Sequence, residues 1–494
     1  MPENSHRNYY AGENLSQDPI HGYIPFSSAT GSADSLGADS SEVDEVSERD
    51  IVDSDWVQRL RQIHQLQTAW LVYPSAEHTR FQHSLGAMHL ASKTLAKLYP
   101  SLVDVCNEIG EPLPSRAYLE SLVRMAALLH HVGHGPFGHF FDAKFLAKYH
   151  LNHEKLGAEI IRQKLAPMLR QIRRNPNGVL EKDETLEPEM IAFLIVRPTV
   201  NDEPAPTTWL RLLRSLFSGL YTVDNMDFVL RDAYMTGFSA RAFDIDRLLH
   251  YSFFTKQGLT VHQKGFATLT RFLAVRAELF RSIYFHRTVR AIDIALDALF
   301  AESGNLLFPK NPLEHLDEYL HFTEWSLLVD VAHWDKSSDP KKRELYPAWH
   351  DFLRRRVPLH LAAETTAIFR AGEREQTSVF ANAESLRRAI LSHLPESMRL
   401  PPSRRAESEY SFEIDIARHL HRPDSHRPTA SQNFLYDPAT NRIRRLEEEE
   451  LYRHIPQSYR ICRIYTQHAE QIAPLAKAMD ALIYAGSEDD ETNM

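Results

Sequence analysis

The chain has 494 residues, 43% of them hydrophobic and 25% charged, with a formal net charge of -10, which is typical of a large globular protein with one big core or two to three domains. Its two cysteines, Cys106 and Cys462, lie far apart in the sequence, so a disulfide scaffold and a cysteine-based zinc or iron–sulfur site are excluded, and a reducing, cytoplasmic location is expected. Neither a signal-peptide core nor an apolar run of the roughly 18–20 residues that span a bilayer is present, so we expect neither secretion nor a membrane role.

The N-terminal region is expected to be polar and acidic around one strand. Residues 1–17 predict a flexible N-terminus, and the segment 18–56 begins with strand-forming residues behind a turn-like Asp18-Pro19. Within it, a serine- and acid-rich stretch at about 27–48 predicts a solvated, low-complexity insertion. The net charge is -8 on residues 32–55, -4 on the tail and -2 on residues 1–31, which leaves about +4 on residues 56–487. Such a body suits a phosphate ligand, but its charge is too weak for a nucleic-acid partner.

From residue 57 onward, apolar residues recur at helical spacing. The pattern i, i+3, i+4, i+7 at 84–99, 116–133, 153–165 and 265–300 predicts an all-α catalytic domain over 57–305. Proline-containing breaks at 309–312 and 337–347 lie in an expected helical extension over 306–402. Strand candidates at 410–417, 432–446 and 458–467, followed by a helix, predict a small α+β C-terminal subdomain over 403–486. The predicted fold class is therefore mainly α.

Histidines are concentrated between residues 78 and 153, where nine of the chain's 26 are found. In the stretch 125–142, MAALLHHVGHGPFGHFFD, an apolar helix ends in two adjacent histidines, and a helix with His139 and Asp142 follows a Gly-His-Gly-Pro break. Imidazoles at a buried helix end are suited to holding a transition metal. Single members such as His89 and His150 are explained as surface residues. The group as a whole is not, because unpaired imidazoles in apolar surroundings are costly.

Two further polar segments accompany the histidines. The segment HTRFQHSLG at 78–86 places Arg80 and His83 on one helical face, and TVDNMDFVLRD at 222–232 contains Asp224, Asp227 and Asp232. No local zinc-protease, phosphate-loop, dinucleotide or serine-hydrolase motif is present. Spacing alone therefore does not show whether the three polar segments form one site.

The order of these segments, a His, then a His pair and then a distant Asp, resembles that of the HD superfamily of metal-dependent phosphohydrolases. The chain is most similar to the deoxynucleoside triphosphate triphosphohydrolase branch, from DPIHG at 18–22 to about residue 300. The stretches that carry the resemblance are QRLRQIHQLQ (58–67), VYPSAEHTRFQHSLGAMHLAS (72–92), ALLHHVGHGPFGHFFD (127–142), NHE (152–154), DNMDFVLRDAYMTG (224–237) and RSIYFHRTVRAIDI (281–294). The resemblance implies an all-α HD core, a nucleotide substrate and a homo-oligomer.

The resemblance implies a metal site made of His83, His130, His131 and Asp224. Position 131 is a histidine where the superfamily has the Asp of its name. Three imidazoles and one carboxylate favour one divalent transition metal, Mn, Fe, Co, Ni or Zn, over Mg. An imidazole does not bridge two ions as a carboxylate does, so a dinuclear centre is not expected. Two outcomes remain open: the metal is retained with a changed preference, or the metal is lost.

The resemblance also assigns roles to residues around the metal. His134, His139 and His153 match histidines that contact phosphates and supply protons, and Asp142 and Glu154 match carboxylates that would orient them. The implied substrate-binding residues are Gln65, Leu66, Arg80, Asn225, Phe228, Arg276 and Tyr284. Of these, Arg80 and Arg276 match phosphate-contacting arginines, and Tyr284 matches a tyrosine near the sugar.

Three positions around the substrate differ from the family. Asn225 stands in place of a phosphate-binding lysine, Phe228 in place of a sugar-contacting tyrosine, and Phe285 in place of a polar residue. One positive charge and one hydroxyl are thereby lost. These changes leave room for a less charged nucleotide, or another phosphate ester, as the substrate.

Two functions are compatible with these observations. The first is a metal-dependent phosphohydrolase that converts a (deoxy)nucleoside triphosphate to nucleoside and triphosphate. The alternative is a degenerate HD domain that binds a nucleotide as a sensor or regulatory module without hydrolysing it. Nucleic-acid binding is not favoured, because the short basic runs, such as 170–174, are balanced by nearby acids or too small.

Overall fold

The computed structural model describes residues 13–28, 46–198, 205–369, 378–394, 412–420, 433–450, 452, 455 and 458–484. Helices dominate, which confirms the predicted mainly α class. Up to residue 307 the helices are α1 (Glu48–Val52), α2 (Asp55–Gln58), α3 (Arg80–Ile109), α4 (Arg116–Leu129), α5 (His139–Lys144), α6 (His153–Ile160), α7 (Ala166–Leu169), α8 (Pro188–Ile195), α9 (Thr208–Arg214), α10 (Val223–Met235), α11 (Ile245–His250), α12 (Phe266–Leu279) and α13 (Arg287–Leu307). They are followed by α14 (Leu316–Leu320), α15 (Glu324–Ala332), α16 (Pro340–Leu353), α17 (Ala383–His393) and α19 (Ile472–Tyr484).

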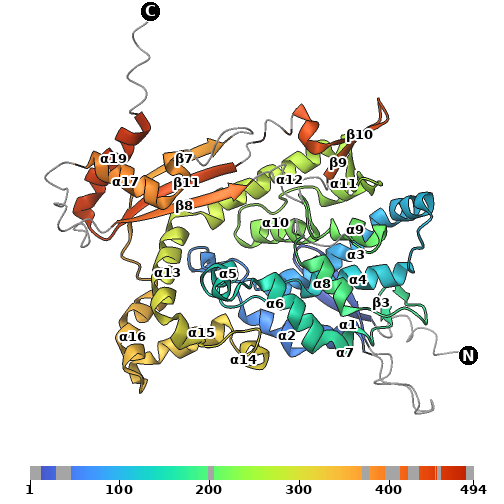
Figure 1. Ribbon diagram of the computed structural model, residues 1–494, viewed down its shortest axis with the longest axis horizontal. Helices are drawn as coiled ribbons and strands as arrows, with labels where there is room; N and C mark the ends of the chain where they lie inside the picture. Colours follow the sequence, from blue (N-terminus) through green and yellow to red (C-terminus); the bar gives the residue numbers. More distant parts are fainter. Residues whose placement is uncertain are drawn as a thin grey trace, which may run out of the picture.

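Strands in the described residues form small sheets at the edges of the helical body. The N-terminal hairpin pairs β1 (Glu13–Asp18) with β2 (Gly22–Ser27), and a short hairpin pairs β3 (Arg174–Asn175) with β4 (Gly178–Val179). A mixed sheet has the order β10 (Arg442–Arg445), β9 (Asn433–Asp437), β6 (Leu259–His262) and β5 (Ser252–Phe254). An antiparallel sheet has the order β7 (His360–Phe369), β11 (Ser458–Thr466) and β8 (Phe412–Leu420). Figure 1 shows this last sheet, with α17 and α19, at one end of the molecule.

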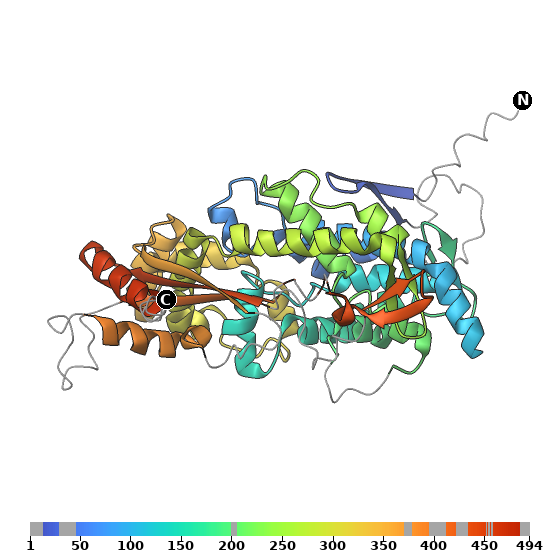
Figure 2. The same ribbon diagram turned by 90° about the horizontal axis from the view of Figure 1, so that it is seen from above.

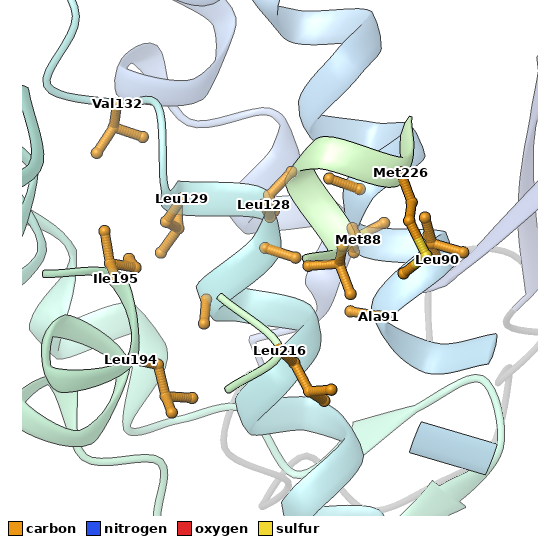
Figure 3. Close-up of a cluster of buried hydrophobic side chains, with 14 of the residues drawn as sticks. Met88, Leu90, Ala91, Leu128, Leu129, Val132, Leu194, Ile195, Leu216 and Met226 are labelled. Carbon is orange, nitrogen blue, oxygen red and sulfur yellow. The ribbon is translucent and has the colours of Figure 1, made fainter. Parts of the chain in front are cut away.

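The core that supports the site lies between α3, α4, α8 and α10. Helix α3 starts with a capping box between Thr79 and Gln82 and ends at Gly110, whose φ of 70° is the left-handed conformation that glycine favours. Figure 3 shows buried side chains from these helices in contact, among them Met88, Leu90, Ala91, Leu128, Leu129, Leu194, Ile195 and Met226. Because α3 and α4 are fixed against each other, the side chains at their ends are held in place.

The loop after α4 is held by buried polar groups. The guanidinium of Arg59, which is 4% exposed, donates to the carbonyls of Val132 and His134 at 3.3 and 2.7 Å. Tyr319 donates its hydroxyl to the carbonyl of Gly133 at 2.9 Å. A Cβ at Gly133 would lie 2.1 Å from the carbonyl oxygen of His153, so this position requires glycine. The loop therefore has a defined shape where its histidines leave the helix.

The C-terminal sheet packs against the junction of α12 and α13, as Figures 1 and 2 show. Its own small core contains Cys462, Ile464 and Leu475. Two tyrosines of β11 donate to the junction: Tyr459 to the carbonyl of Ala277 at 3.0 Å, and Tyr465 to that of Arg287 at 2.7 Å. This sheet therefore lies directly behind one wall of the site described below.

The structure departs from the predicted elements at several points. The predicted helix 265–300 is two helices, separated by a π-helical turn at Phe280–Tyr284 and a break at residues 285–286. The expected helical extension over 306–402 contains the strand β7, because the central strand β11 pairs with it along its length. Strands β9 and β10 do not join the C-terminal sheet, since β9 pairs with β6 of the helical body. Pro347 lies inside α16 instead of ending a helix.

Two departures concern the N-terminal region. Residues 13–17, expected to be flexible, belong to β1 and pair with β2. Glu48, at the end of the predicted insertion, is fully buried because its carboxylate accepts hydrogen bonds from Arg124 at 2.6 and 2.8 Å. The rest of the insertion from residue 29 to 45 and the tail at 487–494 lie outside the described residues.

Candidate active site

Four side chains meet where α4 ends. His83 comes from α3, His130 and His131 follow the last residue of α4, and Asp224 lies in the first turn of α10. One ligand atom from each of the four lies within 4.8 Å of the others. The Nε2 atom of His83 is 3.1 Å from Oδ1 of Asp224 and 3.3 Å from Nε2 of His130. Three imidazoles and one carboxylate are a donor set for a divalent transition metal, so the four predicted ligands fit such an ion.

Hydrogen bonds fix the orientation of two of these histidines. The Nδ1 atom of His83 lies 2.7 Å from Oδ2 of Asp227, and that of His130 lies 2.7 Å from the carbonyl oxygen of Ala127. With Nδ1 donating in each case, both Nε2 atoms face Asp224. Burial alone would lower the pKa of His83, but hydrogen bonds to Asp224 and Asp227 raise it to about 9, so without an ion its Nε2 carries a proton that a metal ion displaces on binding. Both rings are therefore oriented for ligation before any ion binds.

Asp227 is the centre of a buried network behind His83. Its carboxylate, which is 0% exposed, also accepts from His21 Nε2 at 2.6 Å and from Arg231 at 2.9 and 3.0 Å. Arg231 in turn contacts Asp18 at 2.7 Å. A Cβ at Gly86 would lie 2.1 Å from both Arg231 and Asp227. The N-terminal hairpin and Gly86 thus help to orient a metal ligand.

His131 has a different environment. Its ring is 4% exposed and lies 3.8 Å from the ring of His130, between centroids. Nη1 of Arg80 is 3.3 and 3.4 Å from its two ring nitrogens. Burial, together with the positive charge of Arg80, holds the pKa of His131 well below its usual value, so the ring is neutral. Gly138, with φ of 55°, leaves room for Arg80, since a Cβ there would lie 2.2 Å from the guanidinium.

A second cluster adjoins the first and contains His134, His139, Asp142 and His153, again with one ligand atom of each within 4.8 Å of the others. The rings of His134 and His153 stack at 3.7 Å with an interplanar angle of 12°. Nδ1 of His153 is hydrogen-bonded to Asp142, and His139, whose side chain is 64% exposed, lies 3.5 Å from the same carboxylate. Because His139 and His153 are bound to it, Asp142 has a pKa lowered well below its usual value, although burial opposes this.

A cavity of about 340 Å³ opens beside both clusters. Its lining includes the predicted residues Gln65, Leu66, Arg80, His130, His131, His139, His153, Glu154, Asp224, Phe228 and Tyr284. One wall is aromatic, formed by Phe217, Phe228, Phe280 and Phe285. Tyr284 of the lining donates its hydroxyl to Asp232, which also contacts His78 at 2.8 Å.

Some predicted residues do not line this cavity. His83, His134 and Asp142 lie behind its surface, and Asn225 and Arg276 are outside the lining. Arg276 is half-buried and donates to the carbonyl of Leu220 at 3.2 Å. Glu154 was expected to orient a histidine; among the described contacts it instead accepts from Arg197, whose Nε lies 2.9 Å away.

Other residues of the site were not predicted. Asp227 shares a helical face with Asp224 because it follows three residues later, so spacing on α10 could have identified it. The local sequence around Glu324 gave no sign of a role in the site. Its carboxylate lies 2.7 Å from Nδ1 of His64 and accepts a hydrogen bond from the backbone N–H of Phe137 at 3.4 Å. Arg290 and Asp293 also line the cavity, and Arg290 contacts Asp415 of β8 at 2.6 Å.

Comparison with known proteins agrees with this arrangement. The part of the chain from residue 80 to 194, which contains three of the four ligands of the first cluster, matches the family described as the HD domain. The protein contains an HD domain. The remaining candidate ligand of the first cluster, Asp224, comes from α10 beyond the matched residues.

Relatives extend the similarity to the HD triphosphohydrolases. The uncharacterized protein YwfO of Bacillus subtilis is 27% identical over 304 residues, 59% of this chain and 63% of YwfO. The deoxynucleoside triphosphate triphosphohydrolase SAMHD1 of Gallus gallus is 27% identical over 332 residues, 62% of this chain and 52% of SAMHD1. The aligned part thus spans about half to less than two thirds of these relatives. The resemblance predicted from the motifs is confirmed.

A solved structure shows the same fold along nearly the whole chain. The hypothetical protein from Aquifex aeolicus is superimposed with a TM-score of 0.64 over 94% of this chain and 100% of that protein, at 20% sequence identity. At this identity the likeness concerns the fold alone. Among the described residues, no helix combines the length and apolar character needed to cross a bilayer.

Proposed function

We propose that this protein is a metal-dependent phosphohydrolase that cleaves a nucleoside phosphate, with a deoxynucleoside triphosphate yielding nucleoside and triphosphate as the first candidate reaction. One observation carries the proposal: His131, which stands where the superfamily has Asp, still brings a ligand atom to within 4.8 Å of those of His83, His130 and Asp224. The histidine at position 131 therefore replaces an oxygen donor by a nitrogen donor, and the four ligand atoms still lie close together.

The ligands indicate which ions suit the site. Three neutral nitrogens and one carboxylate favour Mn, Fe, Co, Ni or Zn. When bound there, such an ion supplies Lewis-acid polarisation of a phosphate oxygen and acidification of water. Compared with an Asp at position 131, the neutral imidazole leaves one more positive charge on the occupied site, which favours an anionic substrate beside it.

The chain supplies two cationic groups for the phosphate end of the cavity. Burial lowers the pKa of Arg80 to about 10, against the attraction of four nearby carboxylates, Asp142, Asp224, Glu324 and Asp232, so Arg80 remains charged at neutral pH. Arg197 lines the same cavity and pairs with Glu154. These arginines would bind phosphate oxygens and neutralise the charge that develops during cleavage.

The aromatic part of the cavity suits the nucleoside. A base can stack on the aromatic wall, since Phe228, Phe280 and Phe285 all line it. The side-chain oxygen of Gln65 is buried and has no hydrogen-bond partner among the described residues, so it is available to a hydroxyl or amino group of the ligand. Tyr284 and Asp232 form another polar pair of the lining, which a sugar hydroxyl can contact.

Proton transfer falls to the second cluster. His139 is exposed at the cavity and lies 3.5 Å from Asp142, and His153 is bound to the same carboxylate. Either ring, once it has taken up a proton, can donate it to the leaving oxygen while the Asp142 carboxylate holds the ring in place. His134 supports this pair by stacking on His153.

The test is hydrolysis by protein stripped of metal and reloaded with Mn, Fe, Co, Ni or Zn in turn. We expect nucleoside release from at least one deoxynucleoside triphosphate, measured by chromatography, and a loss of at least about a thousandfold in His83→Ala, because the ion would no longer be held. His250→Ala, which changes an exposed histidine of α11, is the matched control. No product with any ion or nucleotide, beside an active reference enzyme, would overturn the proposal.

A nucleotide sensor is the second candidate, and one contact favours it. Arg80 lies 3.3 Å from Nδ1 of His131, where a donor competes with a metal ion for the lone pair. A sensor would bind nucleotide without turnover and with an affinity unaffected by chelators, which calorimetry would show. His131→Asp separates the two functions: it should create hydrolysis in a sensor but mainly shift the metal preference of an enzyme.

A further inference from the structure

The second cluster contains buried polar atoms that lack partners. Neither ring nitrogen of His134, a residue that is 0% exposed, has a hydrogen-bond partner among the described residues. Oδ1 of Asp142 is also buried without a hydrogen bond and lies 3.9 Å from Nδ1 of His134. Buried polar groups are nearly always satisfied, because leaving one unpaired costs on the order of 1–3 kcal/mol. These atoms therefore point to a ligand that binds between them.

The donor atoms indicate the chemistry of that ligand. Three imidazoles and a carboxylate offer lone pairs, and four such atoms lie within 4.8 Å of one another. A tetrahedral zinc ion has bonds of about 2.0–2.2 Å and therefore ligand atoms about 3.5 Å apart, so the cluster needs only a modest contraction. His139 is free to turn because it is exposed. The stacked rings of His134 and His153 must tilt to aim at a common point.

The surrounding charge is compatible with a second cation. Four carboxylates lie near Arg80, whose guanidinium contacts His131 of the first cluster. One divalent ion in the first cluster would not offset them all. The clusters share no ligand, although the rings of His131 and His134 are 4.7 Å apart, so each can be occupied independently.

We propose that His134, His139, Asp142 and His153 bind a second divalent transition-metal ion, for which zinc is the best match, and that this ion inhibits the enzyme. Inhibition follows because the ion occupies the lone pairs and the carboxylate that proton transfer requires. The binding part of the inference stands on the geometry of the cluster, and only the inhibition rests on the proposed function.

Zinc stoichiometry tests the binding part. Full-length protein, purified without chelating resin and stripped, is dialysed against micromolar Zn²⁺ and its metal content is measured by mass spectrometry. We expect two ions per chain in the unaltered protein, one in Asp142→Asn, one in His139→Ala and one in His83→Ala. The exposed His250→Ala should retain two. Because His139 is exposed, its variant is not expected to disturb folding.

The outcomes are distinguishable. A single ion in the unaltered protein, lost only in His83→Ala, would overturn the proposal, as would two ions in both Asp142→Asn and His139→Ala. One ion together with binding of inorganic phosphate that disappears in His139→Ala would show that the histidines of the cluster serve an anion. If two ions bind but no nucleotide is hydrolysed, the proposed function fails and the site stands. If hydrolysis occurs, excess Zn²⁺ should inhibit it at least tenfold in parallel with the second binding step.

Discussion

The two histidine clusters consist of the same residue types but differ in what lies behind them. In the first, His83 is oriented by Asp227 and His130 by the carbonyl of Ala127. In the second, His134 has no hydrogen-bond partner and His139 faces solvent. Ligands that are oriented from behind form a site before the ion arrives, whereas unanchored ligands must rearrange. The first cluster is therefore suited to a resident ion, and the second to groups that exchange ligands or protons.

Removing the Asp227 carboxylate, which orients His83, should leave the first cluster as poorly oriented for metal binding as the second. In Asp227→Asn, the charge that holds His83, His21 and Arg231 is lost, and Arg231 stays buried with only Asp18 to balance it. We expect a 10–100-fold loss of affinity for the first ion, measured by competition with a chromophoric chelator, together with a lower midpoint of thermal unfolding.

The control for this variant is Asp246→Asn, which removes an exposed carboxylate paired with Lys93. It should leave the metal affinity unchanged, because surface pairs contribute little. Equal affinity in Asp227→Asn and the unaltered protein would mean that orientation of His83 does not distinguish the two clusters.

A smaller change, one extra methyl group at Gly86, should displace Asp227 and Arg231 by steric contact without removing a charge. In Gly86→Ala, the new methyl group would meet Arg231 and Asp227 at 2.1 Å, so the ion pair must shift. We expect a loss of about 1–3 kcal/mol in the free energy of unfolding and weaker metal binding, measured by denaturant titration with and without metal.

Helix α13 offers a matched glycine for comparison. A Cβ at Gly304 would have only Phe145 near it, at 4.0 Å, so Gly304→Ala should leave stability unchanged or raise it by up to about 1 kcal/mol. If Gly86→Ala were equally harmless, the network behind His83 would be looser than its contacts indicate.

The same contrast explains how far the sequence could predict the molecule. Helical periodicity located α3, α4 and α6 because it is a local pattern. The four candidate ligands of the first cluster, including the distant Asp224, were located by the resemblance to the HD superfamily. The network behind the ligands was not found, since Asp18, His21 and Arg231 come together only through tertiary packing. The predicted boundary of the helical extension at residue 402 was wrong because long-range strand pairing decides it. Residues 360–369 form the strand β7 since β11 pairs with them.

The cavity wall shows a similar limit. Phe228 and Phe285 were noticed as departures from the family, but their joint effect depends on Phe217 and Phe280, which no motif connects to them. The C-terminal sheet supports this wall, since the ring of His419 on β8 lies 4.2 Å from that of Phe280 and Asp415 holds Arg290. Such a contribution from a distant segment has no signature in the local sequence.

The smallest expected effect concerns His89, a half-buried residue beside His21 that belongs to neither histidine cluster. Burial, with the nearby charges of His21 and Arg124, lowers its pKa to about 4, against about 6.5 in an unfolded chain. Folding therefore favours the neutral ring. Its contribution to stability is fully present above pH 6.5 and is lost as the pH falls towards 4, because the unfolded chain then binds the extra proton.

His89→Met should reduce the fall in unfolding free energy of the metal-free protein between pH 7 and pH 4.5, measured by denaturant titration at each pH. His250→Met, at an exposed position on α11, is the control and should leave that pH dependence unchanged. An unaltered pH dependence in His89→Met would place the acid sensitivity elsewhere in the chain. A reduced one would separate acid destabilisation of the scaffold from acid release of the first ion, which can then be measured on the His89→Met background.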